Sequence, residues 1–212
     1  MKTKLALFLA IIFLMGCGKK FEEYEYLSDP QISEKAPQKM LVYEAAGNPN
    51  ETVGEAFGAL ISTFFKLKKS HDMDMTAPRA RWPKAVDTPK DQWVGIYAIP
   101  VAETVTEIPD DILSEHPALK LETWEYGLVA EILHKGSYAS EGPTVKRLHE
   151  FITESGYEIS GLHEEEYLKG PGMFGPGNPD KYFTIIRYPV AEMVAPVVEP
   201  SSESIETEVT EG

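Results

Sequence analysis

The fold is decided by one stretch of the chain, residues 134–168, HKGSYASEGPTVKRLHEFITESGYEISGLHEEEYL. Pro143 fits the first turn of a helix, because its missing N–H would have no partner there, and Gly156 ends that helix. Between them, apolar residues recur at helical spacing, at Val145, Leu148, Phe151 and Ile152. The stretch therefore predicts a helix between two extended segments.

The residues after this helix are typical of strands. Residues 157–168 have an extended pattern broken by Gly161, and residues 181–190 follow as a further strand. The loop between them, residues 169–180, is rich in glycine and proline, and its apolar tip of Met173 and Phe174 is a candidate lid. Strand, helix and two strands in this order make a βαββ unit.

The first half of the chain repeats this order. A short apolar run at 41–46 precedes two further extended segments, 73–82 and 93–101. Between the run and these segments lies a helical stripe of Val53, Ala56, Phe57, Leu60, Ile61 and Phe64. The strand ends also match, because Tyr97-Ala-Ile-Pro-Val101 corresponds to Ile186-Arg-Tyr-Pro-Val190.

This duplication predicts an α+β domain over residues 38–190. Its two βαββ repeats, at about 38–101 and 121–190, are expected to be related by a pseudo-two-fold axis. We expect an antiparallel sheet that carries both helices on one side.

Three motifs carry a resemblance to a known family. His134-Lys-Gly-Ser-Tyr138, Glu154-Ser-Gly-Tyr-Glu-Ile159 and Glu165-Glu-Tyr167-Leu168 resemble the second half of the GyrI-like small-molecule-binding domain, which is also the effector-binding domain of some AraC- and MerR-type regulators. The resemblance implies the same duplicated βαββ fold and a ligand cleft between the repeats. It also implies that Glu165 points into that cleft.

A second resemblance concerns the first half. Phe57-x-x-Leu60 followed by Met73-Asp-Met-Thr-Ala-Pro78 is similar to the pattern of SOUL-type haem-binding proteins, which share the GyrI-like fold. This resemblance implies haem as the ligand, with His71 as its candidate iron ligand. The five histidines show no paired metal-ligand spacing, so no dedicated metal site is expected, and no cofactor other than haem is considered.

The two ends of the chain predict export. Residues 1–16 combine a basic start with a short apolar run, and Leu14-Met-Gly-Cys17 resembles the bacterial lipoprotein cleavage box. Cys17 would then carry the lipid, residues 17–37 would form a tether, and the protein would face the periplasm from the outer membrane or lie at the cell surface. An ordinary cleaved signal is the alternative. Residues 191–212 are acidic and predict a disordered tail.

The charge and the single cysteine exclude several classes of protein. A net charge of −14 would repel a nucleic-acid backbone, so together with export it argues against a transcription factor. One cysteine excludes an intramolecular disulfide and a cysteine-rich metal site. The expected partners are therefore a small-molecule ligand and the membrane, while the oligomeric state stays open.

Candidate ligand-binding residues lie on the predicted strands. Strand alternation places Glu165 and Tyr167 on one face and Glu164 and Glu166 on the other. Without the family resemblance, a solvated strand explains all three glutamates equally well. The expected site residues are Glu165, Tyr167, Trp82, Tyr138 and Tyr97, although strand aromatics also serve as plain core.

We predict a membrane-anchored protein that binds a small, partly apolar organic molecule between the repeats. Cationic molecules are among the expected ligands. Some GyrI-like proteins hydrolyse reactive cyclopropane-bearing toxins, and that resemblance would make Glu165 and Tyr167 an acid–base pair. The third possibility is a haem-binding protein with His71 as the iron ligand. The sequence has no phosphate loop, nucleophile elbow or catalytic cysteine. We expect a binding protein or, if an enzyme, a hydrolase, because both functions would use the same cleft carboxylate.

Overall fold

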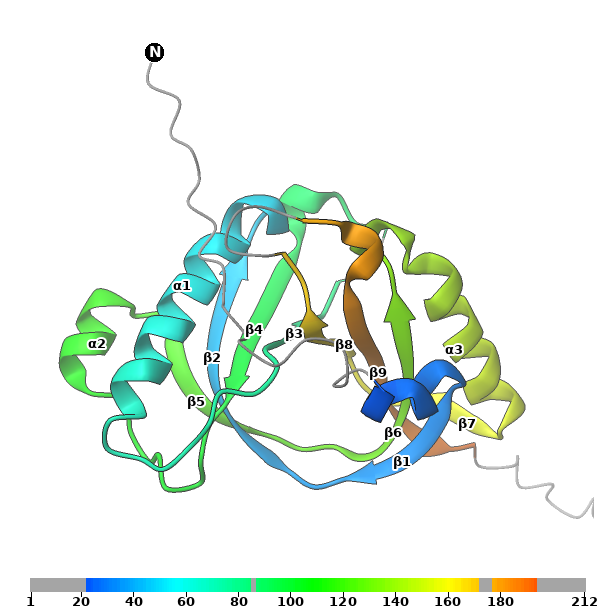
Figure 1. Ribbon diagram of the computed structural model, residues 1–212, viewed down its shortest axis with the longest axis horizontal. Coiled ribbons are helices and arrows are strands. Elements are labelled where there is room, and N and C mark those ends of the chain that lie inside the picture. Colours follow the sequence, from blue (N-terminus) through cyan, green and yellow to red (C-terminus); the bar gives the residue numbers. More distant parts are fainter. Residues whose placement is uncertain (1–21, 85–86, 172–176, 194–212) are drawn as a thin grey trace, which may run out of the picture.

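The computed structural model of the chain (Figure 1) describes residues 22–84, 87–171 and 177–193. The predicted signal, Cys17, the tip of the 169–180 loop and nearly all of the acidic tail lie outside these residues. Within the described ranges, no helix combines the length and the apolar character needed to cross a bilayer.

Each repeat contains the predicted strand, helix, strand, strand order. The first repeat consists of β2 (Gln38–Ala46), α1 (Pro49–Leu67), β3 (Arg79–Trp82) and β4 (Val94–Pro100). The second consists of β6 (Gly127–Lys135), α3 (Gly142–Glu154), β8 (His163–Lys169) and β9 (Phe183–Glu192). Three further strands and one short helix complete the fold: β1 (Gln31–Lys35), β5 (Leu119–Trp124), β7 (Tyr157–Ile159) and α2 (Asp110–Glu115).

The strands form one curled antiparallel sheet, a half-barrel, in the order β1-β6-β9-β8-β3-β4-β2-β5, with β7 paired to β9. The two repeats meet in the middle, where β3 of the first pairs with β8 of the second. Helix α1 packs beside β2 and β4, and α3 packs beside β6, on the same side of the sheet (Figure 1). The predicted fold class is confirmed.

The edge strands cross between the halves. β5 stands in the chain where the second repeat was predicted to begin, yet it pairs with β2 of the first repeat. β1, which precedes the first repeat, pairs with β6 of the second. The prediction that residues 17–37 are only a tether is therefore wrong over the 3-10 helix η1 (Glu22–Ser28) and β1, because Leu27 is buried against Leu133 and Ile185.

Helix α1 forms where the sequence predicts it. Pro49 occupies its first turn, and the side chain of Asn48 accepts a hydrogen bond from the backbone N–H of Asn50 at 3.1 Å. The predicted apolar stripe faces the sheet, with Ala56, Leu60, Ile61 and Phe64 buried. This packing makes the larger of two cores on the helix side, the smaller one lying under α3.

The segment before β3 is less regular than predicted. Residues 73–82 were expected to be extended throughout, but only Arg79–Trp82 pairs in the sheet. Met73 and Met75 instead pack against the α1 core. The short strand β3 is nonetheless the one that joins the repeats.

Candidate functional site

Glu165 stands in an otherwise uncharged row of side chains that crosses the sheet. Paired residues of neighbouring strands point to the same face. The row that contains Glu165 runs from strand to strand as Leu119, Tyr43, Tyr97, Ala80, Glu165, Ile186 and Ile132. Its other members belong to the cores under the two helices. Glu165 is therefore a carboxylate on the helix-covered face, and the residue is only 9% exposed.

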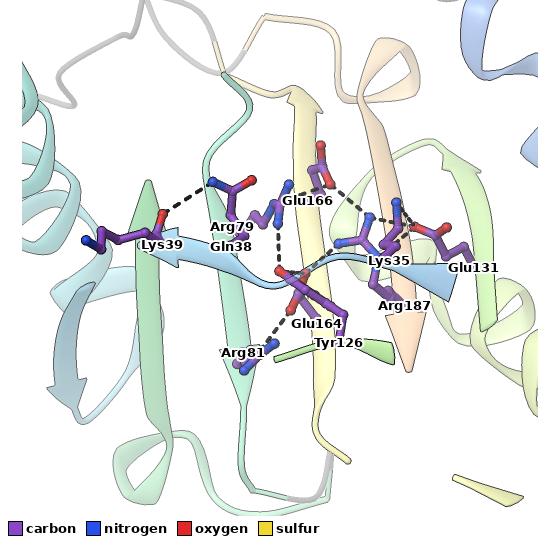
Figure 2. A network of polar contacts seen from close by, with 10 residues as sticks. All are labelled: Lys35, Gln38, Lys39, Arg79, Arg81, Tyr126, Glu131, Glu164, Glu166 and Arg187. Atoms are coloured by element: carbon purple, nitrogen blue, oxygen red, sulfur yellow. Dashed lines mark hydrogen bonds and ion pairs between the residues drawn. The ribbon is translucent and has the colours of Figure 1, made fainter. Parts of the chain in front are cut away.

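The two glutamates that flank Glu165 point to the opposite face and are paired with arginines (Figure 2). Arg187 donates to Glu164, to Glu131 at 2.6 Å and to Glu166 at 2.9 Å. The predicted alternation of faces along β8 is thus seen in these contacts. The alternative of a solvated strand is wrong, because Glu164 is 1% exposed.

This ion network neutralises every carboxylate that it contains. Arg81 donates to Glu164 at 2.8 Å, Arg79 lies 3.3 Å from Glu166, and Lys35 lies 3.2 Å from Glu131. Burial alone would lower the pKa of Arg187, but the neighbouring glutamates raise it. The network links neighbouring strands through ion pairs on the sheet face opposite the helices.

Glu165 has different partners. Its Oε1 lies 3.1 Å from Nε2 of His163, and Nδ1 of His163 lies 2.6 Å from the hydroxyl of Tyr188. In the neutral tautomer that satisfies both contacts, His163 donates to Glu165 and accepts from Tyr188. Within the described part of the chain, Glu165 forms no ion pair with a lysine or arginine, and its contact with His163 is a hydrogen bond.

The predicted aromatic residues form a connected series of ring contacts around Glu165. Tyr167 lies 5.6 Å from Tyr138 and 6.3 Å from Phe57, measured between ring centroids. Phe57 lies 5.3 Å from Tyr97, which lies 5.7 Å from Trp82. The five residues predicted from the sequence thus lie together on the helix-covered face, and we call them the inter-repeat site: Trp82, Tyr97, Tyr138, Glu165 and Tyr167.

The tyrosines of the inter-repeat site are held in their neutral form. Burial, followed by the charge of Glu165, raises the pKa of both Tyr138 and Tyr167 well above the usual value for tyrosine. Tyr97 is 1% exposed, and Nε1 of Trp82 is buried without a hydrogen-bond partner among the described residues. These side chains therefore offer neutral rings around one carboxylate.

A second carboxyl group faces the same residues. Glu141, the residue before α3, is 8% exposed, and its side chain makes no capping hydrogen bond to the helix. Burial, and then the charge of Glu165, raises the pKa of Glu141 to about 9. The charge of Glu141 in turn contributes to the raised pKa of Tyr138, Tyr167 and Tyr188.

His71 lies apart from these residues. It follows α1, and its Nδ1 is 3.1 Å from the hydroxyl of Thr104. No group of three or more potential metal-ligating side chains occurs within the described ranges. A shallow depression of about 330 Å³ lies over α3, lined by His149, Glu150, Thr153 and Glu154, and it contains none of the predicted site residues.

Sequence reasoning missed three polar residues near Glu165. His163 precedes Glu165 by two positions on β8, so strand alternation could have placed it on the same face. Tyr188 pairs across the sheet from Ala130, and no local pattern connects it with His163. Glu141 resembles an ordinary helix-start residue, and only its burial distinguishes it.

The chain matches a known class of small-molecule-binding domains. The model of the GyrI-like small molecule binding domain matches residues 28–190. The chain belongs to this family. No curated protein matches the chain significantly in sequence.

Solved structures share this fold. An uncharacterized conserved protein from Listeria innocua is 22% identical, with a TM-score of 0.67, and the match covers 81% of this chain and 98% of that one. A hydrolase from Listeria innocua is 21% identical, with a TM-score of 0.64 and the same coverage. The C-terminal domain of EcmrR is 13% identical, with a TM-score of 0.53, covering 78% of this chain and 98% of that domain.

Proposed function

We propose that the protein binds a partly apolar organic cation at the inter-repeat site, with Glu165 as the counter-charge. One observation carries this proposal: on a single strand, Glu164 and Glu166 are neutralised by arginines, whereas Glu165 has no arginine or lysine partner among the described residues. Hydrogen bonds from His163 and Tyr167 offset only part of the solvation that a buried carboxylate loses. A cationic ligand supplies the missing partner.

The rings around Glu165 fit the apolar part of such a ligand. Cations are attracted to aromatic faces, most strongly when both groups are withdrawn from water. Tyr167 and Tyr138 supply rings from the second repeat, and Tyr97 and Trp82 supply rings from the first. The ligand therefore contacts both repeats, and its charge lies closer to the second.

Calorimetric titration with a naphthylmethyl-trimethylammonium salt tests the proposal. Removing the charge with Glu165→Gln should weaken binding about tenfold to a hundredfold, because the Coulomb attraction between two unit charges about 5 Å apart is at most roughly 3 kcal/mol at an effective dielectric constant of about 20. Glu158→Gln is the matched control, since Glu158 is exposed on β7. Glu166→Gln is unsuitable because Glu166 belongs to the ion network. Equal affinities of the Glu165 and Glu158 variants would refute the proposal.

Hydrolysis of a reactive electrophile is the second candidate. It is favoured by the contact of Glu165 with Tyr167 and by the nearby carboxyl group of Glu141, whose raised pKa suits the role of a general acid. Some proteins with this fold are described as hydrolases. Incubation with a cyclopropane-bearing electrophile, followed by mass spectrometry of the products, tests this candidate. Turnover that Glu165→Gln and Tyr167→Phe both abolish would support it, and unchanged turnover would exclude the pair.

We further propose that the mature protein is anchored to the bacterial membrane through a lipid on Cys17. The support is the Leu14-Met-Gly-Cys17 box after a basic and apolar start. Acyl chains contribute ~0.8 kcal/mol per buried CH₂, so several chains hold a protein stably. Cys17→Ser should abolish acylation in a labelling experiment. A mature N-terminus at another residue would contradict the anchor.

A further inference from the structure

Glu141 is a buried acidic residue, and no contact within the described part of the fold offsets the free-energy penalty of burying its carboxyl group. It is more than nine-tenths buried, and its Oε1 has no hydrogen-bond partner among the described residues. The free N–H groups of a helix's first turn could pair with a nearby acceptor, but the Glu141 side chain makes no hydrogen bond to them. A buried polar atom without a hydrogen-bond partner destabilises the fold, and a hydrogen-bond donor on a bound ligand would remove this penalty.

Glu141 is placed next to the inter-repeat site by the chain around it. Its backbone N–H donates to the carbonyl of Tyr138 at 3.3 Å, so the two residues occupy one turn. The ring of Tyr138 in turn packs against Tyr167, two residues after Glu165. The effects of the Glu141 charge on Tyr138, Tyr167 and Tyr188 agree with this position.

We propose that Glu141 is a second ligand-binding carboxyl group of the inter-repeat site and that it selects cations carrying N–H donors over fully alkylated cations. This inference rests on the proposed function. A carboxyl group offers an acceptor oxygen, which an ammonium, amidinium or guanidinium group can satisfy through an N–H. A quaternary ammonium can satisfy the charge of Glu165 but leaves the Glu141 oxygen without a donor.

A matched pair of ligands tests the selection. Naphthylmethylammonium and its N-trimethyl derivative share the ring and the charge, and they differ in N–H donors. The protein should bind the first about tenfold or more tightly than the second in calorimetric titration, because one hydrogen bond to a charged group accounts for that ratio. Glu141→Met, which removes the acceptor oxygen, should reduce the preference several-fold, whereas Glu154→Met, at an exposed position on the same helix, should retain it.

The outcomes separate this inference from the proposed function. Equal binding of both ligands by the unmodified protein, with Glu165→Gln weakening both, overturns the role of Glu141 and leaves the cation site intact. A preference that persists in Glu141→Met also overturns it, because the bulk of the methyl groups would then be the cause. If neither ligand binds, or if Glu165→Gln has no effect, the proposed function fails and this inference fails with it.

Discussion

Ala80 and Glu165 lie opposite each other where β3 meets β8, and they are also counterparts in the two repeats. Ala80 pairs with Tyr97 and Glu165 with Ile186, and these two positions begin the matching strand ends of the repeats. The pseudo-two-fold axis therefore passes between an alanine and a glutamate. The site of the duplicated fold is therefore asymmetric. The second repeat supplies both acidic residues as well as rings, whereas the first repeat supplies aromatic rings alone.

The ion network on the opposite face should contribute strongly to stability. Arg187→Met keeps the bulk of the side chain but removes the cation shared by Glu131, Glu164 and Glu166. Breaking a buried ion pair on one side costs about 3–5 kcal/mol. Urea unfolding should show a loss of this size. Arg147→Met is the control, because Arg147 is an exposed partner of Asp29 and should cost at most about 1 kcal/mol. Similar losses in both variants would contradict the structural role of the network.

Glu141 should make stability depend on pH. In the unfolded chain its carboxyl group ionises near the ordinary pKa of 4.5, whereas in the folded protein the pKa is raised to about 9. The folded state therefore holds a proton that the unfolded state has lost, and stability must fall as the pH rises between these values. This group contributes at most about 1.4 kcal/mol per pH unit.

Glu141→Gln removes this titration. The free energy of unfolding in urea, measured between about pH 6 and pH 8.5, should decline less steeply in this variant than in the unmodified protein. Glu154→Gln, which removes an exposed carboxylate from the same helix, should leave the slope unchanged. Parallel curves for all three proteins would show that the Glu141 carboxyl is not buried as described.

Helix η1 should be part of the folded domain. Leu27 is 1% exposed and packs with Leu133 and Ile185. Leu27→Ala should cost about 2–5 kcal/mol in urea unfolding, as for other fully buried leucines. Tyr26→Ala should cost much less, because Tyr26 is 61% exposed. A Leu27 variant as stable as the Tyr26 variant would restore the interpretation of this segment as a tether.

The repeat architecture could be predicted because its signals are local. The helical stripe of α1, the proline and glycine at the ends of α3, and the matching strand ends each lie within a few residues. The crossing of β1 and β5 to the other repeats could not be predicted, since it depends on pairings between distant segments. β1 pairs with β6 across the molecule, and its own sequence, QISEK, has no strong strand period.

The site was only partly predictable for a related reason. Alternation along β8 separates Glu165 from Glu164 and Glu166 without any tertiary information. The sequence does not show that arginines neutralise Glu164 and Glu166 on the other face. Arg79 and Arg81 lie on β3 and Arg187 lies on β9, so their contacts depend on how these strands pair with β8. Complementary spacing of Arg79-x-Arg81 and Glu164-x-Glu166 was the available signal, and it becomes readable only once β3 and β8 are known to pair.

A crystal structure of the protein with naphthylmethylammonium tests the central claim most directly. The account predicts that the ammonium nitrogen lies within hydrogen-bond distance of a Glu165 oxygen and that the naphthyl ring packs against the rings of Tyr167 and Tyr138. The Glu141 oxygen, which has no partner among the described residues, should accept a second N–H. A ligand bound elsewhere, with Glu165 still held by His163 and no contact to the ammonium, would contradict the account.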